Sequence, residues 1–402
     1  MIEVSLYGNK VGILEQRKEG IFFDFYDSFR SHPLPISPYK LDPQVKMTYN
    51  YFDSMFANGM PGIMHDSMPD GYGAMMMQKY FRQLQGSSIV TPLQKLAFVG
   101  TDGIGALEYT PSQTHEDMFD IDITTLPHVL KSEFEGSIPD VLKEFIKRPS
   151  PGGARPKTSV LYDEAAGIMK GGHTKNSTKS LVPWIIKFDE DDSQMTILEK
   201  LYQDIASNSG ILTSESKLLY VEDEVHFAIK RFDRNGAEKL HQATVSGLQH
   251  LSHIETNNFS YENLLTMTQQ LTRDMSQVQD MYKRMVLNVV GANHDDHLKN
   301  FSFTMDKDGV WRLSPIYDVV YNTGPATFGE HFLSINKKVS NINKKDLLKA
   351  GQIVSLADKE MNSYIEEVSD SFSDALNNIT SYGLSAEMIK ELKAGTHYML
   401  GK

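Results

Sequence analysis

The sequence contains no cysteine and only two tryptophans among its 402 residues. The absence of cysteine excludes disulfides, thiolate nucleophiles and cysteine-ligated metal centres, and it is typical of proteins in reducing compartments. No run approaches the roughly 20 apolar residues that span a bilayer. The segment after Met1 also lacks the basic and apolar blocks of a signal peptide. We therefore expect a cytoplasmic protein without a membrane partner.

Positive charge is also scarce, because 40 lysines and arginines face 52 acidic residues and the net charge is -12. This balance argues against a broad nucleic-acid-binding surface on the chain. Hydrophobic residues at 40% and charged residues at 23% are typical of a globular protein. The length is sufficient for two or three domains with a substantial core.

Polar and ionisable groups are concentrated in residues 291–303, directly after a helical pattern. Asp295 and Asn300 are five residues apart, which is the spacing of the base and a magnesium ligand in protein-kinase catalytic loops. Asp296 is only four residues from Asn300. The spacing therefore selects Asp295 as the catalytic base and leaves Asp296 with a supporting role that it does not define.

A second carboxylate follows a predicted hairpin. Residues 301–304 and 310–313 are strand-like and flank the turn sequence Asp-Lys-Asp-Gly at 306–309, which is a strong hairpin signal. The hairpin would return Asp318 to the neighbourhood of Asn300. Two oxygen ligands from separate segments, together with nucleotide phosphates, form the open octahedral site that Mg²⁺ prefers. These residues predict phosphoryl transfer with ATP and Mg²⁺ as cofactors.

The nucleotide side of such a site has three candidates upstream. The loop at 150–157, Ser-Pro-Gly-Gly-Ala-Arg-Pro-Lys, exposes backbone amides beside cations, as a phosphate site does, although a tight turn with exposed cations is the alternative. Lys187 ends an apolar strand like the Val-Ala-Ile-Lys strand of kinases, and a charge on a solvated edge is the alternative there. The helix predicted at 193–209 carries Glu199, which we predict to form a supporting ion pair with Lys187.

Strand signals dominate the first part of the chain and helical signals the last. We predict an α+β, two-lobed protein-kinase-like fold with a β-rich N-terminal lobe and a helical C-terminal lobe. The predicted parts are a small β-rich subdomain at 1–110, a nucleotide-binding N-lobe at 111–233 and a helical catalytic C-lobe at 234–402. Helices are predicted at 258–274, 277–290, 344–353, 357–377 and 385–392.

The motifs together resemble the HipA-type toxin kinases, two-lobed serine/threonine kinases of bacterial toxin-antitoxin systems. The most specific element is Asp-Asp-His-Leu-Lys-Asn at 295–300, followed by Tyr-Asp at 317–318. The resemblance spans nearly the whole chain. Supporting segments lie at 68–73, 100–107, 150–157, 186–187, 231–234 and 240–242.

This resemblance implies a role for each matching residue. Asp295 would be the catalytic base that takes the proton of a substrate hydroxyl, and Asn300 and Asp318 would bind magnesium. Ser150 matches an autophosphorylation site whose modification ejects its loop and silences the kinase. The family often has glutamate where this chain has Lys230. The implied ATP-binding residues are Gly153, Ala154, Arg155, Lys157, Lys187, Lys230, Phe232 and His297.

The resemblance also implies partners. A protein substrate is expected, which in some family members is an aminoacyl-tRNA synthetase. A helix-turn-helix antitoxin is implied as well, and operator DNA would be bound through it.

Two other functions compete with this hypothesis. His294, Asp295, Asp296 and His297 could ligate a transition metal in a metal-dependent phosphohydrolase, but such sites need further histidines on neighbouring helices. A catalytically weak transcriptional co-repressor, bound to the antitoxin, is the non-enzymatic alternative. The presence of the base, both metal ligands and the strand lysine favours the kinase.

Overall fold

The computed structural model describes residues 1–52, 57–85, 90–113, 117–124, 153, 155–189, 193–253, 259–324 and 327–397. They form two compact units, and each unit combines separate stretches of the chain. Unit 1 is made of Met1–Asp192, Leu219–Leu251 and Thr304–Val310. Unit 2 is made of Ser193–Leu218, Ser252–Phe303 and Trp311–Lys402.

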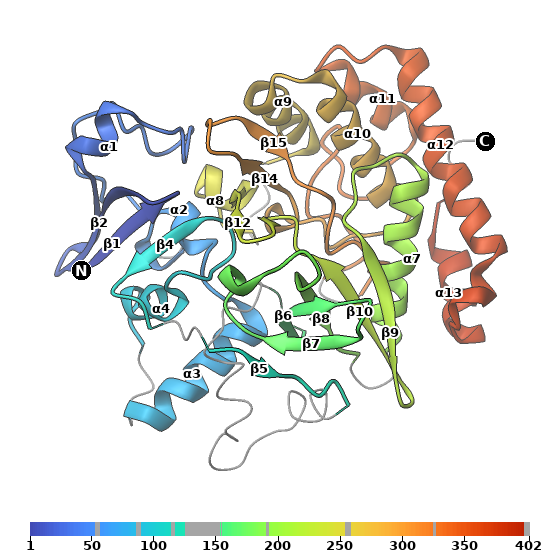
Figure 1. Ribbon diagram of the computed structural model, residues 1–402. Helices are drawn as coiled ribbons and strands as arrows, with labels where there is room; N and C mark the ends of the chain where they lie inside the picture. The colour runs from blue at the N-terminus through green and yellow to red at the C-terminus, as the bar shows by residue number, and fades with distance from the viewer. Residues whose placement is uncertain are drawn as a thin grey trace. The chain divides into compact units, whose positions relative to one another are not determined.

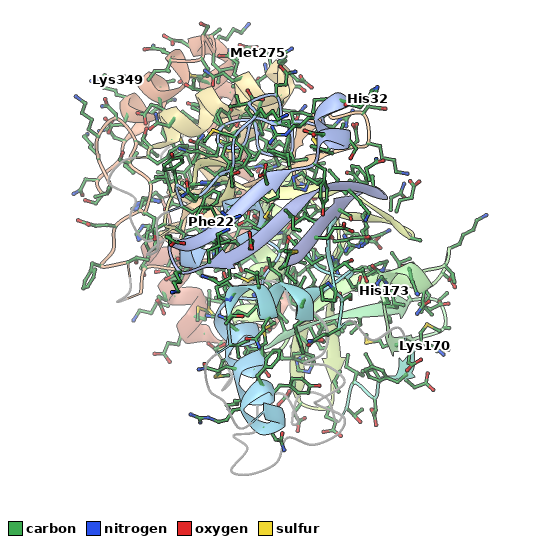
Figure 2. All side chains as sticks on the ribbon, turned by 90° about the vertical axis from the view of Figure 1, so that its left-hand side faces the viewer. Phe22, His32, Lys170, His173, Met275 and Lys349 are labelled. Carbon is green, nitrogen blue, oxygen red and sulfur yellow. The ribbon has the colours of Figure 1, made fainter. Side chains whose placement is uncertain are left out.

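Unit 1 begins with a four-stranded antiparallel sheet in the order β3-β2-β1-β4. In β1 every second residue is buried, which places Ile2, Val4 and Leu6 in the core. Phe22 of β3 is labelled in Figure 2. The strands are β1 (Ile2–Leu6), β2 (Asn9–Arg17), β3 (Gly20–Phe25) and β4 (Leu107–Thr110), and the short helix α1 (Asp27–Ser31) follows β3.

The second sheet has six strands in the order β5-β7-β6-β8-β10-β9 (Figure 1), and it belongs to unit 1 except for the first three residues of β9. Trp184 and Ile186 lie on the same face of β8. They share one buried cluster with Tyr80 and Phe81 of α3 (Gly71–Gln85) and Phe98 of α4 (Pro92–Val99). One face of the sheet therefore packs against these two helices. The strands are β5 (Phe119–Asp120), β6 (Lys157–Asp163), β7 (Ile168–Gly171), β8 (Val182–Lys187), β9 (Ser216–Val221) and β10 (Glu224–Lys230).

Several shorter elements complete unit 1. Thr91 caps α4 with a capping box, and Pro92 occupies the first helical position, where its missing N–H costs nothing. The helices are η1 (Ala57–Gly59), α2 (Gly62–His65), α3 (Gly71–Gln85), α4 (Pro92–Val99), η2 (Thr174–Asn176) and α8 (Val245–Gln249). The remaining strands are β11 (Arg234–Asn235), β12 (Glu238–Lys239) and β13 (His241–Thr244).

Unit 2 is mainly helical. Its central helix α10 packs against α9 and α12, and α12 also packs against α7 and α11. Two helices of this unit, α9 and α11, begin with capping boxes, at Ser260 and Asn343. The helices are α7 (Met195–Asn208), α9 (Tyr261–Thr272), α10 (Met275–Val290), α11 (Lys344–Gln352), α12 (Asp358–Asn377) and α13 (Ala386–Gly395), with the short turns η4 (Leu298–Asn300) and η5 (Ile379–Tyr382).

A hairpin interrupts the helices. Gly309 has a φ of +79° and closes the predicted turn, with its N–H 3.1 Å from the carbonyl of Asp306. At the far end of the hairpin, the N–H of Ser314, the residue after β15, donates to the carbonyl of Ser302 on β14 over 3.1 Å. The strands are β14 (Ser302–Met305) and β15 (Trp311–Leu313).

The fold class agrees with the prediction, because the N-terminal part is rich in sheet and the C-terminal part is helical. The three-part division at 110 and 233 stays a prediction. None of the helices in the described ranges has the length and apolar character needed to span a bilayer.

Acid is expected to destabilise the protein through the buried His241. This side chain is fully buried on β13, its Nε2 lies 3.0 Å from the carbonyl oxygen of Ile36, and burial lowers its pKa to about 4. The unfolded chain binds a proton near pH 6.5, whereas the folded chain does not until about pH 4. Stability from this group is therefore present above pH 6.5 and is lost as the pH falls toward 4, by up to about 1.4 kcal/mol per pH unit.

His241→Gln, which keeps an N–H donor for Ile36, should reduce this loss. Urea unfolding at several pH values between 7 and 4 gives the slope of unfolding free energy against pH. The slope should be smaller for the variant by up to about 1.4 kcal/mol per pH unit, and His32→Gln, at an exposed histidine (Figure 2), serves as the control. Equal slopes for the wild type and His241→Gln would contradict the assignment.

Candidate active site

The predicted catalytic loop lies in unit 2, directly after α10. Asn300 ends the turn η4, and its Nδ2 donates a hydrogen bond of 2.8 Å to the backbone carbonyl of Asp295. The side chain of Asp295 is 40% exposed, and its Oδ1 lies 4.0 Å from Nε2 of His297. The loop backbone is therefore fixed by Asn300, while the carboxylate of Asp295 is accessible from solvent.

Asp296 points the other way, into the protein. Its carboxylate is buried and accepts hydrogen bonds from the Tyr261 hydroxyl at 2.7 Å, from Nδ1 of His331 at 2.8 Å and from the N–H of Phe332 at 2.7 Å. Burial, together with the charge of Asp296, raises the pKa of Tyr261 well above its usual value, so its hydroxyl remains a donor. Asp296 thus anchors the loop, a role that the spacing along the sequence did not define.

The position of Asp296 also bears on the phosphohydrolase alternative. A carboxylate whose two oxygens accept three internal hydrogen bonds is poorly placed to bind a metal ion. Within the described ranges, moreover, no three histidine, aspartate or glutamate side chains converge as metal ligands would. His294, Asp295, Asp296 and His297 therefore do not form the cluster of metal ligands that the phosphohydrolase alternative requires.

Asp318, the second predicted magnesium ligand, follows the β14–β15 hairpin. The hydroxyl of Tyr317 donates to the backbone carbonyl of Lys299 over 2.7 Å, and these two residues immediately precede Asp318 and Asn300. The hairpin therefore brings the two predicted ligand segments together, as expected from the sequence. Asp318 has a φ of +54°, a left-handed conformation that aspartate tolerates better than most residues.

Unit 1 carries two of the predicted phosphate-binding lysines on neighbouring strands. Lys157 on β6 lies directly opposite Lys187 on β8 in the antiparallel register. By strand alternation, both lie on the face of the sheet away from Trp184 and Ile186, hence away from α3 and α4. Lys157 is only 5% exposed. The register therefore places two positive charges side by side on this face of the sheet.

Gly153 lies against the amine of Lys157. Its φ is +109°, a conformation that favours glycine, and a Cβ atom at this position would collide with Nζ of Lys157. The N–H of Gly153 donates to the side chain of Asp70, and its carbonyl accepts the N–H of Tyr72 at 3.0 Å. Asp70 therefore positions Gly153, a function that the sequence did not assign to it. The bare glycine and the two lysines fit the phosphates of a nucleotide.

The segment at 230–234, which carries Lys230 and Phe232 between β10 and β11, is held by a buried ionic cluster. Asp233 accepts hydrogen bonds of 2.7 Å from both Arg231 and Arg234 and one of 2.8 Å from the N–H of Gly105. Burial alone would raise the pKa of Asp233, but the two guanidinium charges outweigh it and hold the pKa well below its usual range. Both arginines also bond the carbonyl of Gly103. This cluster fixes the backbone on both sides of Phe232.

The other predicted residues are placed as follows. Arg155 is exposed, and Lys230 and Phe232 are half-buried. Glu199 is buried on α7 of unit 2, whereas Lys187 belongs to unit 1, so their ion pair stays a prediction. Ser150 and Ala154 lie outside the described residues.

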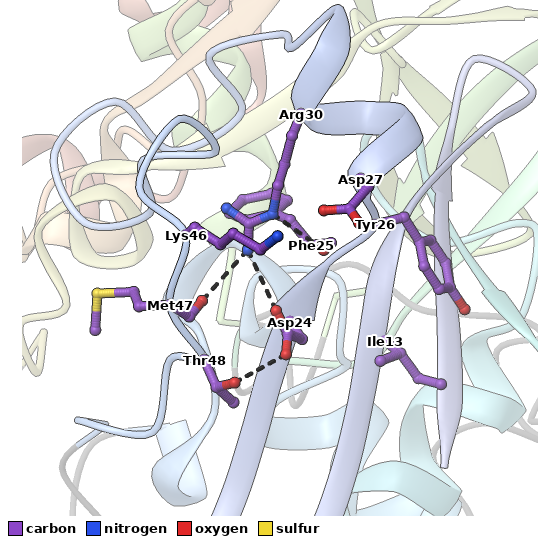
Figure 3. A pocket seen from close by; sticks show the side chains of 9 residues that line it. All are labelled: Ile13, Asp24, Phe25, Tyr26, Asp27, Arg30, Lys46, Met47 and Thr48. Atoms are coloured by element: carbon purple, nitrogen blue, oxygen red, sulfur yellow. Dashed lines mark hydrogen bonds and ion pairs between the residues drawn. The ribbon is translucent and has the colours of Figure 1, made fainter.

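A pocket of about 500 Å³ lies at the N-terminal sheet of unit 1, and none of the predicted site residues lines it (Figure 3). Arg30 contributes to its wall, but the guanidinium is engaged by Asp24 at 3.2 Å and by the carbonyls of Pro43 and Met47 at 2.9 and 3.3 Å. Arg30 therefore holds the loop at 43–47 rather than offering its charge to a ligand.

Two protein-family models match the sequence of this chain. The family model of the HipA N-terminal domain matches residues 2–110, and that of the HipA-like C-terminal domain matches residues 149–376. The chain belongs to the HipA family. The predicted catalytic loop, both predicted metal ligands and the lysine pair all lie within the segment matched to the HipA-like C-terminal domain.

Three proteins that are similar to this HipA-family chain are between 16% and 29% identical to it over the matched residues. A Haemophilus influenzae protein named "Putative kinase" is 29% identical over 141 residues, which are 33% of this chain and 40% of that protein. "Putative kinase Y4dM" of Sinorhizobium fredii is 23% identical over 381 residues, covering 89% and 87% of the two chains. The HipA chain in the solved complex of Shewanella oneidensis HipA, HipB and operator DNA has a TM-score of 0.74 at 16% identity and covers 100% of this chain and 96% of its own. The last likeness confirms the predicted fold.

Proposed function

We propose that this HipA-family chain is an ATP- and Mg²⁺-dependent serine/threonine protein kinase that phosphorylates a protein substrate and autophosphorylates on Ser150. The observation that carries the proposal is the catalytic loop. Asn300 bonds the backbone carbonyl of Asp295, and the buried side chain of the next residue, Asp296, anchors the same loop, while Asp295 keeps a solvent-accessible carboxylate. A general base must combine this fixed position with access to the substrate.

Each of the site residues has a separate role in the proposed reaction. Asp295 orients the substrate hydroxyl and takes its proton, and Asn300 and Asp318 provide oxygen ligands for the metal. Lys157 and Lys187 hold the phosphates, and the bare backbone of Gly153 lets them approach the loop. ATP, when bound with Mg²⁺, supplies the phosphoryl group, and the metal neutralises the charge that develops on it.

An assay with labelled ATP and Mg²⁺ tests the proposal, with Lys187→Met as the variant. Autophosphorylation should fall by about 100-fold, because a positioned charge on the transferring phosphates is lost. Lys170→Met is the matched control. Lys170 lies on β7 of the same sheet, where it forms a partly exposed ion pair with Asp120 (Figure 2), and its removal should change the rate little. Equal rates for Lys187→Met and the wild type would rule out the nucleotide assignment.

The proposal includes a helix-turn-helix antitoxin as partner and operator DNA bound through it. It is supported by the solved HipA of Shewanella oneidensis, which is in a complex with HipB and operator DNA. The net charge of -12 is consistent with DNA contact through a partner rather than through a broad surface of this chain.

A further inference from the structure

A tight turn at 327–330 carries an aromatic residue in an unfavourable conformation. The N–H of Glu330 donates to the carbonyl of Thr327 over 2.9 Å, and Phe328 and Gly329 between them have φ values of +52° and +72°. Two successive positive φ angles under such a hydrogen bond define a type I′ turn, which favours Asn-Gly. A bulky side chain at its first central position is a steric outlier, so local backbone preference does not explain Phe328.

Phe328 is also the most exposed large apolar side chain in the described parts of the chain, at 88%. The other strongly exposed apolar residues described in unit 2 are Leu212, Met275 and Ile353, none of them aromatic. Strain and exposure at the same residue point to a role outside the folding of the chain, because packing within the fold accounts for neither.

The turn is attached rigidly to the catalytic loop. Directly after it, the side chain of His331 and the N–H of Phe332 both bond Asp296, the neighbour of the predicted base. The N–H of His331 also donates to the carbonyl of Val339 over 2.8 Å. On the other side, the hydroxyl of Thr327 donates to the carbonyl of Gly324 over 2.9 Å. Both ends of the turn are therefore held, and one of them is bonded to the residue next to Asp295.

We propose that Phe328 is a substrate-docking residue, which contacts an apolar side chain at a fixed number of residues from the serine or threonine that is phosphorylated. This inference rests on the proposed kinase function and specifies the class of its substrate. We assign Phe328 to the protein substrate rather than to another partner because the substrate's hydroxyl must reach Asp295. The residues that directly follow the turn bond Asp296, the neighbour of Asp295. An exposed aromatic ring on a turn whose ends are held is the kind of anchor on which protein recognition concentrates.

The variant Phe328→Asn separates recognition from folding. Asparagine is favoured at this turn position, so the melting temperature should not fall below that of the wild type. The probe is an oriented library of peptides with one central serine or threonine and degenerate flanking positions. The wild type should select an aliphatic or aromatic residue at one flanking position, and Phe328→Asn should lose about tenfold in kcat/KM on the selected peptide through a higher KM. Ile353→Asn is the control, because Ile353 is the next most exposed apolar residue described in unit 2. This variant should retain the wild-type preference.

The outcomes distinguish this inference from the proposed function. In one outcome the wild type autophosphorylates but phosphorylates no peptide, and in another it shows no preference for an apolar flanking residue. Either result would overturn the docking role but would not contradict the proposed kinase function. An unchanged preference in Phe328→Asn would also overturn it, and a changed oligomeric state in light scattering would then assign the residue to a contact between copies. A wild type that transfers no phosphate to itself or to any peptide would overturn the kinase function and the docking role together.

Discussion

Replacing Asp295 with asparagine is expected to lower the rate of autophosphorylation by about 10²- to 10⁴-fold, the range that a positioned general base contributes. The amide has nearly the same shape as the carboxylate but cannot take the proton of the attacking hydroxyl. The hydrogen bond from Asn300 goes to the backbone carbonyl of Asp295, so the substitution leaves it in place. Single-turnover transfer from labelled ATP at saturating Mg²⁺ measures the effect.

The same variant should be almost as stable as the wild type, because the replaced side chain is 40% exposed. Urea unfolding provides this control and separates lost catalysis from lost folding. A rate within threefold of the wild type would show that Asp295 is not the base.

Asp296→Ala should act in the opposite way, with its main effect on stability. The substitution leaves Tyr261, His331 and the N–H of Phe332 buried without their common acceptor. Removing one member of such a buried charged network lowers the free energy of unfolding by about 3–5 kcal/mol. Urea unfolding at pH 7 measures it, and catalysis should be lost as well because the loop loses its anchor.

Asp370→Ala on α12 is the matched control for that measurement. This aspartate is exposed in the same unit, and its loss should change the free energy of unfolding by no more than about 0.5 kcal/mol. If Asp296→Ala lowered the free energy of unfolding by less than about 1 kcal/mol, the anchoring role described above would be wrong.

Local patterns in the sequence predicted much of the fold. The helical pattern at 357–377 corresponds to α12 (Asp358–Asn377), and that at 344–353 to α11 (Lys344–Gln352). Helical periodicity and capping residues are short-range signals, so one sequence suffices to read them. The five-residue spacing of Asp295 and Asn300 is equally local, and the structure joins the two residues by a direct hydrogen bond.

The parts that were missed depend on residues far apart in the sequence. Asp296 takes its role from Tyr261 and His331, each 35 residues away along the chain. Asp70 holds Gly153 across 83 residues. The lysine pair depends on the register between β6 and β8, which no local pattern fixes. Such pairings follow from the whole fold and leave no short-range signal.

Because unit 1 consists of three separate stretches of the chain, the order of synthesis limits when it can fold. Its last segment, Thr304–Val310, is separated from Met1–Asp192 by the helices α7, α9 and α10 of unit 2. At 5–20 residues per second, a ribosome reaches Val310 roughly 6 to 24 s after Asp192. Unit 1 thus cannot be completed during translation before the predicted catalytic loop has also been made. A truncated chain that ends before Thr304 lacks both this segment and Asp318, so the proposed kinase activity requires synthesis at least as far as Asp318.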